Sequence, residues 1–414
     1  MKRIGLIGFG TVGSGVYERL NQSKEEIHQV LGEKVEVAAI LVKDRQKKRT
    51  VHVDALVTTN WEQFLEAGPY DLVFEAIGGI EPALTYTKYW LEKGIPVITA
   101  NKKLVAEKGE YLEKAAQVNS TYYGYEAAVA GGIPIINALK GTLATTAISR
   151  VSGILNGTTN YMLTEMIEKN RSFADVLIEA QQLGYAEADP TDDLEGYDAW
   201  YKIRILSRLC FGYWPQAEDF SKKGVSAMMD WHVEVGERIG FKIKLIAEAW
   251  LGDKNVAGRV SPAFLTQTEP LTSVRGVTNG ISLEGNSINQ LLFIGPGAGK
   301  EATANSMVED LIFHERTKNF KKAEGRNASY GNETFTHSFV FLTHEQRDQA
   351  LQWVKDHQIS VLDTFSHHEG EVGSLNIQRS RLLNRIRFME MFPRENARKR
   401  LIQRNSGRSD FSFL

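Results

Sequence analysis

The sequence predicts an α/β protein of more than one domain, and three observations carry that prediction. The chain has 414 residues, which exceeds one ordinary domain and suggests two or three. Near its start, a glycine-rich turn lies between an apolar strand and a helical pattern. Further apolar strands then alternate with helical segments, which is typical of a parallel sheet covered by helices.

The first strand and helix surround a GxGxxG sequence, made up of Gly8, Phe9, Gly10, Thr11, Val12 and Gly13. The motif is weak alone, but a strand precedes it, a helix follows it, and residues 35–42 read as a second strand. Gly8 would permit a tight turn, and Gly10 would let the backbone approach a pyrophosphate closely. Gly13 would let the helix pack closely on the strand. The pattern predicts a Rossmann-type parallel-sheet domain; the alternative is a glycine-rich turn in another α/β protein.

A basic segment, KDRQKKR at residues 43–49, follows the second strand. Domains that bind NAD usually place an acidic residue here to bind the ribose hydroxyls, and Asp44 is available. Lys43 and Arg45 flank it, and such cations suit the 2′-phosphate of NADP. We therefore expect NADP as the preferred cofactor, with NAD also usable. The alternative is a solvated basic loop.

Two later strands lie within residues 70–79 and 95–104, and each ends in a polar or glycine-rich turn. Ligands of open parallel sheets bind outside the carboxyl ends of the strands. Glu75 and Lys102 are therefore expected to project towards the cofactor. A lysine after a strand is usually only solvated, so position alone does not single out Lys102.

Beyond this region the pattern of strands and helices continues through residues 122–140, 148–166 and 173–184. The first segment reads as a strand, a glycine turn and the start of a helix. The second reads as a strand followed by a helix, with its N-cap expected from Thr158, Thr159 or Asn160. The third reads as an amphipathic helix that Gly184 ends.

An acidic stretch, GYAEADPTDDLEGYDAWYK, occupies residues 184–202 and ends on Lys202. Its carboxylates do not follow the alternating pattern of a calcium loop. Asp198 and Lys202 are four residues apart, so on a helix they would share one face. Burial would lower the lysine pKa and nearby acids would raise it, and the sequence leaves this balance open.

Together, ANKK (100–103), GILNGTTNYML (153–163) and the acidic stretch resemble homoserine dehydrogenases, and the acidic stretch fits that family's signature at its fixed positions. Residues 274–288 and 293–311 look like later segments of the family. The resemblance covers roughly residues 1 to 320. It implies reversible NAD(P)H-dependent reduction of L-aspartate 4-semialdehyde to L-homoserine, in threonine, methionine and isoleucine biosynthesis.

The resemblance also implies the domain organisation. A Rossmann domain would span residues 1–130, completed by about 300–320. An α+β substrate-binding, catalytic and dimerisation domain with a large sheet would span 131–299. A small α+β module, a diverged ACT-like domain for regulation or oligomerisation, would span 330–414. The family assembles as a homodimer or homotetramer, and the sequence does not determine which.

Roles are implied residue by residue for the reaction and the substrate. Lys202 matches the proton donor and acceptor at the substrate oxygen, and Lys102 a lysine near the nicotinamide. Glu187 matches the residue that holds the substrate ammonium. The remaining matches are Asp193 and Asp198 around the amine, the hydroxyl and the lysine, and Thr158 and Tyr185 as substrate contacts.

The cofactor and a metal ion are also implied. The GxGxxG turn, Lys43, Arg45 and Lys102 would bind the cofactor. Gly297 lies in GPGAGK (295–300), whose backbone could close over it; the alternative is a plain strand-to-helix turn. A structural sodium ion would be held by Glu126 and by the carbonyl groups of Val129, Gly131 and Ile133.

Composition excludes several classes of protein. A net charge of −2 leaves no electrostatic footprint for nucleic acid or an anionic membrane. The sequence contains no run of eighteen apolar residues, the length that a membrane-spanning helix needs. The lone Cys210 fits a reducing compartment, so we expect a cytoplasmic protein. Aspartate-semialdehyde dehydrogenase, the alternative enzyme, needs a nucleophilic cysteine, and Cys210 lies in an apolar helical stretch. The presence of all the candidate catalytic residues disfavours a regulator that has lost catalysis.

The C-terminal segment departs from the family. Strands are expected within residues 337–343, 359–368 and 372–378, and helices within 345–358 and 380–404. The segment lacks the usual Asp-Arg-Pro-Gly turn of an ACT domain, so threonine regulation is left open. A lysine at position 103, often a small residue in the family, also leaves open whether Lys102 or Lys103 faces the nicotinamide.

Overall fold

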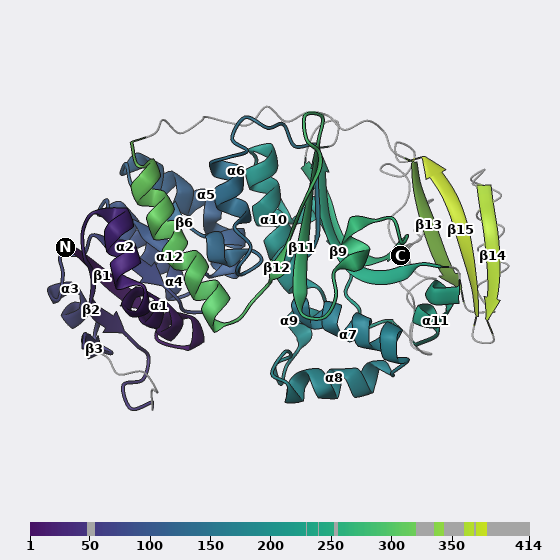
Figure 1. The fold of residues 1–414 in the computed structure, drawn as a ribbon, viewed down its shortest axis with the longest axis horizontal. Helices are drawn as coiled ribbons and strands as arrows, with labels where there is room; N and C mark the ends of the chain where they lie inside the picture. The colour runs from purple at the N-terminus through teal and green to yellow at the C-terminus, as the bar shows by residue number, and fades with distance from the viewer. Residues whose placement is uncertain are drawn as a thin grey trace, which may run out of the picture.

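The computed structural model describes residues 1–47, 54–228, 230–238, 240–251, 256–319, 335–342, 360–367 and 370–378. Within these ranges the strands form three sheets, of six, six and three strands (Figure 1). A membrane-spanning helix is not found among these residues, since none of their helices is both long and apolar enough.

The first sheet is parallel throughout and has the order β3-β2-β1-β4-β5-β6. Its strands are β1 (Lys2–Ile7), β2 (Val35–Leu41), β3 (Leu56–Thr58), β4 (Leu72–Glu75), β5 (Val97–Thr99) and β6 (Tyr123–Gly124). This is the doubly wound order, in which ligands bind where the strand order reverses, here between β1 and β4. The predicted Rossmann-type sheet is confirmed.

Helices cover both faces of this sheet because its strands are apolar on both sides. One face packs against α1 (Thr11–Gln22), α2 (Lys24–Leu31) and α12 (Lys300–Thr317). The other face packs against α3 (Trp61–Glu66), α4 (Ala83–Glu92) and α5 (Lys102–Val118). Alternate residues of β1 serve the two cores: Leu6 points to the first and Ile7 to the second.

Helix α12 returns the chain to this sheet after the second sheet is complete, and Figure 1 shows it beside α1. The two helices approach closely at Gly15, where a Cβ atom would lie 2.9 Å from the Lys300 carbonyl oxygen. An ion pair of 2.6 Å joins Lys300 to Glu18. Segments far apart in the sequence therefore share one helical layer.

The second sheet is mixed, with the order β12-β11-β7-β9-β10-β8, and only the β10–β8 pair is parallel. Its strands are β7 (Arg150–Ile154), β8 (Phe220–Lys222), β9 (Lys242–Leu251), β10 (Val256–Leu265), β11 (Thr278–Gly285) and β12 (Asn289–Pro296). Its helices are α6 (Ile135–Lys140), α7 (Gly157–Lys169), α8 (Phe173–Gln182), α9 (Thr191–Leu194), α10 (Tyr197–Phe211) and α11 (Asp230–Arg238).

Helix α10 links the two large sheets. It packs on β7, β9 and β10 of the second sheet and on α5, which covers the first sheet. Each of these two sheets, together with its helices, forms one of the two large units of the molecule. Close approach is possible because Gly109 of α5 lies against Trp214, just beyond α10; a Cβ atom there would lie 2.3 Å from the indole. One hydrophobic core runs through α5, α10 and the second sheet, so side chains on α5 and α10 are held in fixed relation.

The third sheet is a small antiparallel one near the end of the chain. Its strands are β13 (Phe335–Leu342), β14 (Ser360–His367) and β15 (Gly370–Gln378), in the order β13-β15-β14. The three predicted strands are confirmed. The helices predicted within residues 345–358 and 380–404 lie outside the described residues.

We expect alanine substitutions at Gly10 and Gly13, in the turn between β1 and α1, to affect the stability of the protein differently. Gly8 has a φ of +96°, and a Cβ atom on Gly13 would lie 2.1 Å from the Gly8 carbonyl oxygen. Gly13→Ala should therefore reduce the free energy of unfolding by about 1–3 kcal/mol, the usual cost of overpacking. At Gly10 no described atom lies within 4 Å of an added Cβ, so Gly10→Ala should lose clearly less stability than Gly13→Ala. Chemical unfolding of both variants checks this; equal losses would contradict it.

Candidate active site

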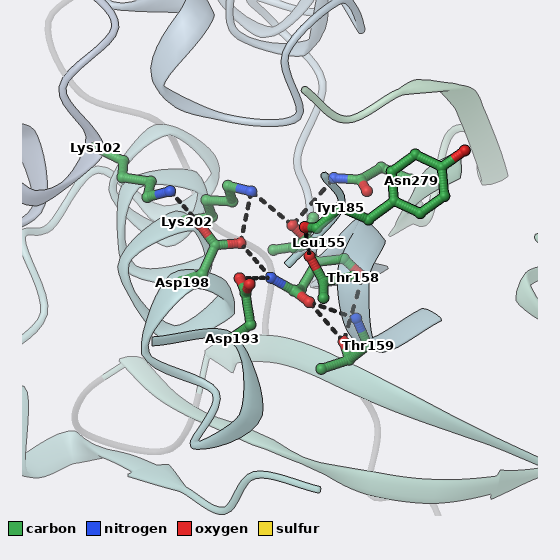
Figure 2. A network of polar contacts seen from close by, with 10 residues as sticks. Lys102, Leu155, Thr158, Thr159, Tyr185, Asp193, Asp198, Lys202 and Asn279 are labelled. Atoms are coloured by element: carbon green, nitrogen blue, oxygen red, sulfur yellow. Dashed lines mark hydrogen bonds and ion pairs between the residues drawn. The ribbon is translucent and has the colours of Figure 1, made fainter. Parts of the chain in front are cut away.

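Three charged side chains meet where α5 contacts α10 (Figure 2). Lys202 donates from Nζ to Oδ2 of Asp198 at 2.8 Å, one helical turn earlier on α10. Lys102, the first residue of α5, pairs through Nζ with Oδ1 of the same carboxylate. The predicted pairing of Asp198 with Lys202 across one helical turn is confirmed. Lys103 is exposed, so Lys102 is the lysine that contacts Asp198.

The surroundings shift all three pKa values. Asp198 is 4% exposed, and burial alone would raise its carboxyl pKa, yet Lys102 and Lys202 hold it well below its usual range. The charge of Asp198 raises the pKa of Lys102. Burial lowers the pKa of Lys202, which is 6% exposed, and outweighs the attraction of Asp198. The balance that the sequence left open is therefore settled in favour of burial.

The Lys202 ammonium has two protein acceptors among the described residues. One is Asp198, and the other is the carbonyl oxygen of Leu155, at 2.7 Å from Nζ. Leu155 immediately follows β7, and Asp198 lies on α10, so both acceptors come from elements of the second unit. An ammonium group has three N–H bonds, which leaves one for a ligand.

Asn156 organises the carboxylates, and sequence reasoning missed it. Its Nδ2 donates to Asp193 at 2.7 Å and to Asp198 at 2.9 Å. Its Oδ1 accepts from the backbone N–H of Thr159 at 2.8 Å and so caps α7. The N-cap expected from Thr158, Thr159 or Asn160 was therefore wrong. Asn before Gly157 was the available signal, because Asn is a preferred N-cap residue.

The predicted substrate residues divide into two groups. Thr158 and Asp193 border the charged centre, and the pKa of Asp193 is raised by burial and then by Asp198. Tyr185 lies beside Thr158 and accepts its hydroxyl at the backbone carbonyl, at 2.7 Å, while its side chain is 42% exposed. Glu187 is exposed, and its carboxylate forms no hydrogen bond within the described part of the chain. The structure therefore places Glu187 apart from this hydrogen-bond network.

A chain of hydrogen bonds positions Lys102 from below. Glu75, at the end of β4, accepts from the hydroxyl of Thr99 at the end of β5. The Thr99 hydroxyl accepts from the backbone N–H of Asn101 at 2.9 Å, and Asn101 caps α5 through Leu104 N–H. Glu75 is fully buried, and its carboxylate is hydrogen-bonded to other residues of the protein. The expectation that it projects towards the cofactor was therefore wrong. A buried carboxylate needs such partners.

The turn after β1 fits a dinucleotide. Gly10 caps α1 with no side-chain hydrogen bond, and the first turn of α1 contains no acidic residue. Its backbone N–H groups and helix dipole therefore suit the pyrophosphate anion. Lys43 and Arg45 are exposed just after β2, which ends at Leu41. Gly297, in the predicted cofactor segment, is buried against the start of β11.

One of the predicted sodium residues, Glu126, is a buried carboxylate that lies close to a second one, Asp310. Glu126 is 1% exposed, and burial followed by the charge of Asp310 raises its pKa to about 8. Its carboxylate accepts from two backbone N–H groups at the start of α6, while Asp310 accepts from the Glu126 N–H at 2.9 Å. The described residues include no group of three or more His, Cys, Asp or Glu residues suited to a metal. Two neighbouring carboxylates nevertheless suit a hard cation, which would favour their ionised form.

Two family models match the chain. The model described as "Homoserine dehydrogenase" matches residues 134–312, and the model described as "Homoserine dehydrogenase, NAD binding domain" matches residues 8–126. A homoserine dehydrogenase of Bacillus subtilis (strain 168) is 39% identical over 311 residues, covering 75% of this chain and 72% of that protein. The corresponding enzyme of Lactococcus lactis subsp. lactis (strain IL1403) is 37% identical over 312 residues, with coverage of 75% and 73%.

Solved structures agree with these matches. A homoserine dehydrogenase from Thiobacillus denitrificans superposes with a TM-score of 0.84 at 33% identity, covering 92% of this chain and 93% of that one. A hyperthermophilic archaeal homoserine dehydrogenase in complex with NADPH has a TM-score of 0.65 at 25% identity, with coverage of 78% and 99%. The similarity includes both large sheets, since each comparison covers more than three quarters of this chain.

The buried Glu75 predicts a pH-dependent stability. Burial raises its pKa from 4.5 to about 7, so between these values the folded state holds a proton that the unfolded chain has released. Stability should therefore fall as pH rises through this window, by roughly 3 kcal/mol. Glu75→Gln should remove this fall. Urea unfolding at acidic and alkaline pH measures it, with Glu62→Gln as a control for loss of an exposed glutamate. An equal fall in Glu75→Gln and wild type would contradict the assignment.

Proposed function

Because this chain belongs to the homoserine dehydrogenase family, we propose that the triad of Lys102, Asp198 and Lys202 is its catalytic centre. The reaction interconverts L-aspartate 4-semialdehyde and L-homoserine with a nicotinamide cofactor, a step in the biosynthesis of threonine, methionine and isoleucine. One observation carries the proposal: the buried Lys202 ammonium is fixed by two acceptors, at 2.7 and 2.8 Å, and keeps one N–H for the substrate.

Lys202 moves the proton in this proposal. The nicotinamide cofactor, held by the glycine turn of residues 8–13, would supply a hydride to the aldehyde carbon. The aldehyde oxygen then gains negative charge and needs a positioned acid. The lowered pKa of Lys202 makes it a stronger acid than an ordinary lysine. In the oxidation of homoserine the same group, once neutral, accepts the hydroxyl proton.

Asp198 and Lys102 prepare that lysine. The carboxylate stays ionised because two ammonium groups lower its pKa, so it holds Lys202 in one orientation. Lys102 is 41% exposed at its side chain and remains protonated, since Asp198 raises its pKa. It adds positive potential at the side of the centre formed by α5, where oxygen charge develops.

The substrate carries an ammonium group whose desolvation is costly unless carboxylates replace its water. Asp193 lies 2.7 Å from Asn156 and can present its other oxygen to that group. Glu187 is exposed, and we assign it to the substrate ammonium by the match to the family motif. Thr158 and Tyr185 would contact the rest of the substrate, supported by the 2.7 Å hydrogen bond from the Thr158 hydroxyl to the Tyr185 carbonyl oxygen near the triad.

We assign NADP as the preferred cofactor, with NAD also accepted. The glycine turn, residues 8–13, would hold the pyrophosphate, and Lys43 and Arg45 the 2′-phosphate. The backbone of the segment that contains Gly297 would close over the cofactor. Support comes from the exposure of both cations and from the archaeal relative that was solved with NADPH.

A sodium ion is proposed at Glu126 with the carbonyl groups of Val129, Gly131 and Ile133. The neighbouring carboxylate of Asp310 supports it, because two buried negative charges are stabilised by a cation. The ion would have a structural role, since it lies beside the helix layer that includes α12.

The proposed domains are the Rossmann domain (1–130, with about 300–320), the catalytic and dimerisation domain (131–299) and the C-terminal module (330–414). We propose assembly into a homodimer or homotetramer. The edge strand β12 supports this, since it exposes Leu292 and Ile294 on one face.

A cytoplasmic location is proposed from the single cysteine. Cys210 is fully buried in α10, which disfavours the alternative enzyme with a cysteine nucleophile.

Lys202→Ala should lower the rate of homoserine oxidation by about 10²–10⁴-fold, the usual contribution of a general acid–base group. The dissociation constant of NADPH should change little. Stopped-flow measurement of cofactor reduction and a fluorescence titration test the two expectations. Lys103→Ala, at the exposed neighbour of Lys102, is the control and should react at the normal rate. Near-normal turnover in Lys202→Ala would remove Lys202 from the mechanism.

The cofactor assignment predicts the effect of removing two cations. Lys43→Ala combined with Arg45→Ala should weaken NADP binding by about 30-fold or more, since each contact with a charged group contributes substantially. NAD binding should hardly change, and the preference should shrink as salt rises. The control removes two exposed cations of α5, through Lys108→Ala and Lys114→Ala. Equal losses for NADP and NAD would mean that the segment is a solvated loop.

A further inference from the structure

Asn279 contacts the same carbonyl oxygen as the proposed catalytic lysine. It lies near the start of β11 and is fully buried. Its Nδ2 donates to the carbonyl oxygen of Leu155 at 3.0 Å, and Lys202 donates to that oxygen at 2.7 Å. Figure 2 shows the two side chains approaching Leu155 from different directions. Asn279 thus touches the Lys202 environment through a single backbone group.

The other side of Asn279 faces the predicted cofactor segment. A Cβ atom on Gly297 would lie 2.1 Å from both Cγ and Oδ1 of Asn279, so glycine is required there. Oδ1 has no hydrogen-bond partner among the described residues, although it is buried. One hydrogen bond and the contact with Gly297 therefore hold the Asn279 side chain in place.

The Leu155 carbonyl group is important because it helps to orient the ammonium group of Lys202. Two of the three N–H bonds point at Asp198 and Leu155, and their directions determine where the third one points. Asp198 is held by Lys102 and Asn156, whereas the Leu155 carbonyl is held from its other side by Asn279. Small errors in the placement of a proton donor slow a reaction strongly.

We propose that Asn279 is a positioning residue, which fixes the Leu155 carbonyl for Lys202 and makes the aim of that lysine depend on the segment containing Gly297. The inference rests on the proposed role of Lys202. A change in the position of this segment would move Asn279 directly, because the Gly297 backbone packs against its side chain. Closure over the cofactor and proton transfer are thereby coupled through one side chain.

The test uses Asn279→Leu, which keeps a similar branched shape and removes the donor. We expect kcat for homoserine oxidation to fall about tenfold, the scale of one lost hydrogen bond. The dissociation constant of NADPH and the Tm should remain near those of the wild type. Asn286→Leu makes the same change at an exposed site between β11 and β12, and should leave kcat unchanged.

The decisive comparison combines Asn279→Leu with Lys202→Ala. A residue that acts through Lys202 has no further effect once that lysine is absent, so the double variant should react as slowly as Lys202→Ala. If Asn279→Leu lowers the residual rate again by the same factor, the inference is overturned. Normal turnover of Lys202→Ala alone would instead overturn the proposed catalytic role of Lys202, so the two failures are distinguishable.

The link to the cofactor segment has its own comparison. Gly297→Ala should lower kcat in the wild-type background, because its methyl group displaces the Asn279 side chain. In Asn279→Ala the three atoms nearest to that methyl group are gone, so the same Gly297→Ala change should have a several-fold smaller effect. Equal effects in the two backgrounds would show that Gly297 does not act through Asn279.

Discussion

The burial of one carboxylate between two ammonium groups is the constraint on which the rest of the site depends. Asp198 is almost completely withdrawn from water, and an unpaired charge at that depth would cost several kcal/mol. Lys202 satisfies one oxygen and Lys102 the other. Since the two lysines come from α10 and α5, the charge can be buried only when both large units are in contact. The proposed catalytic centre and the junction between the units are therefore one feature.

Neutral groups complete what the ion pairs begin. Asn156 joins Asp193 to Asp198 while capping α7, and Asn101 caps α5 immediately before Lys102. Each amide therefore fixes a helix start, and Asn156 also holds two carboxylates of the proposed site. The carboxylates of Glu126 and Asp310 present the opposite situation, because the pKa of each is raised by burial. Negative charge is compensated at the proposed catalytic centre by lysines and, at Glu126 and Asp310, by a proton or a cation.

Local patterns were sufficient for much of the fold. The strand, glycine turn and helix at the start of the chain predicted the Rossmann-type sheet, because φ > 0 and close packing restrict such positions to glycine. The spacing of Asp198 and Lys202 predicted their ion pair, because residues four apart share a helix face. The acidic signature, with two other motifs, indicated the family. All of these are properties of residues close together in the chain.

The sequence by itself therefore determined the first sheet, the family and the ion pair within α10. Only the tertiary structure decided what surrounds them. Leu155 acts through a backbone carbonyl, which every residue has, so no sequence pattern could single it out. Asn279 reaches that carbonyl across 124 positions of the chain. Glu75 points into the protein because it accepts a hydrogen bond from Thr99, and Thr99 lies on another strand. The lowered pKa of Lys202 likewise depends on burial by distant elements, and burial is a property of the packed molecule.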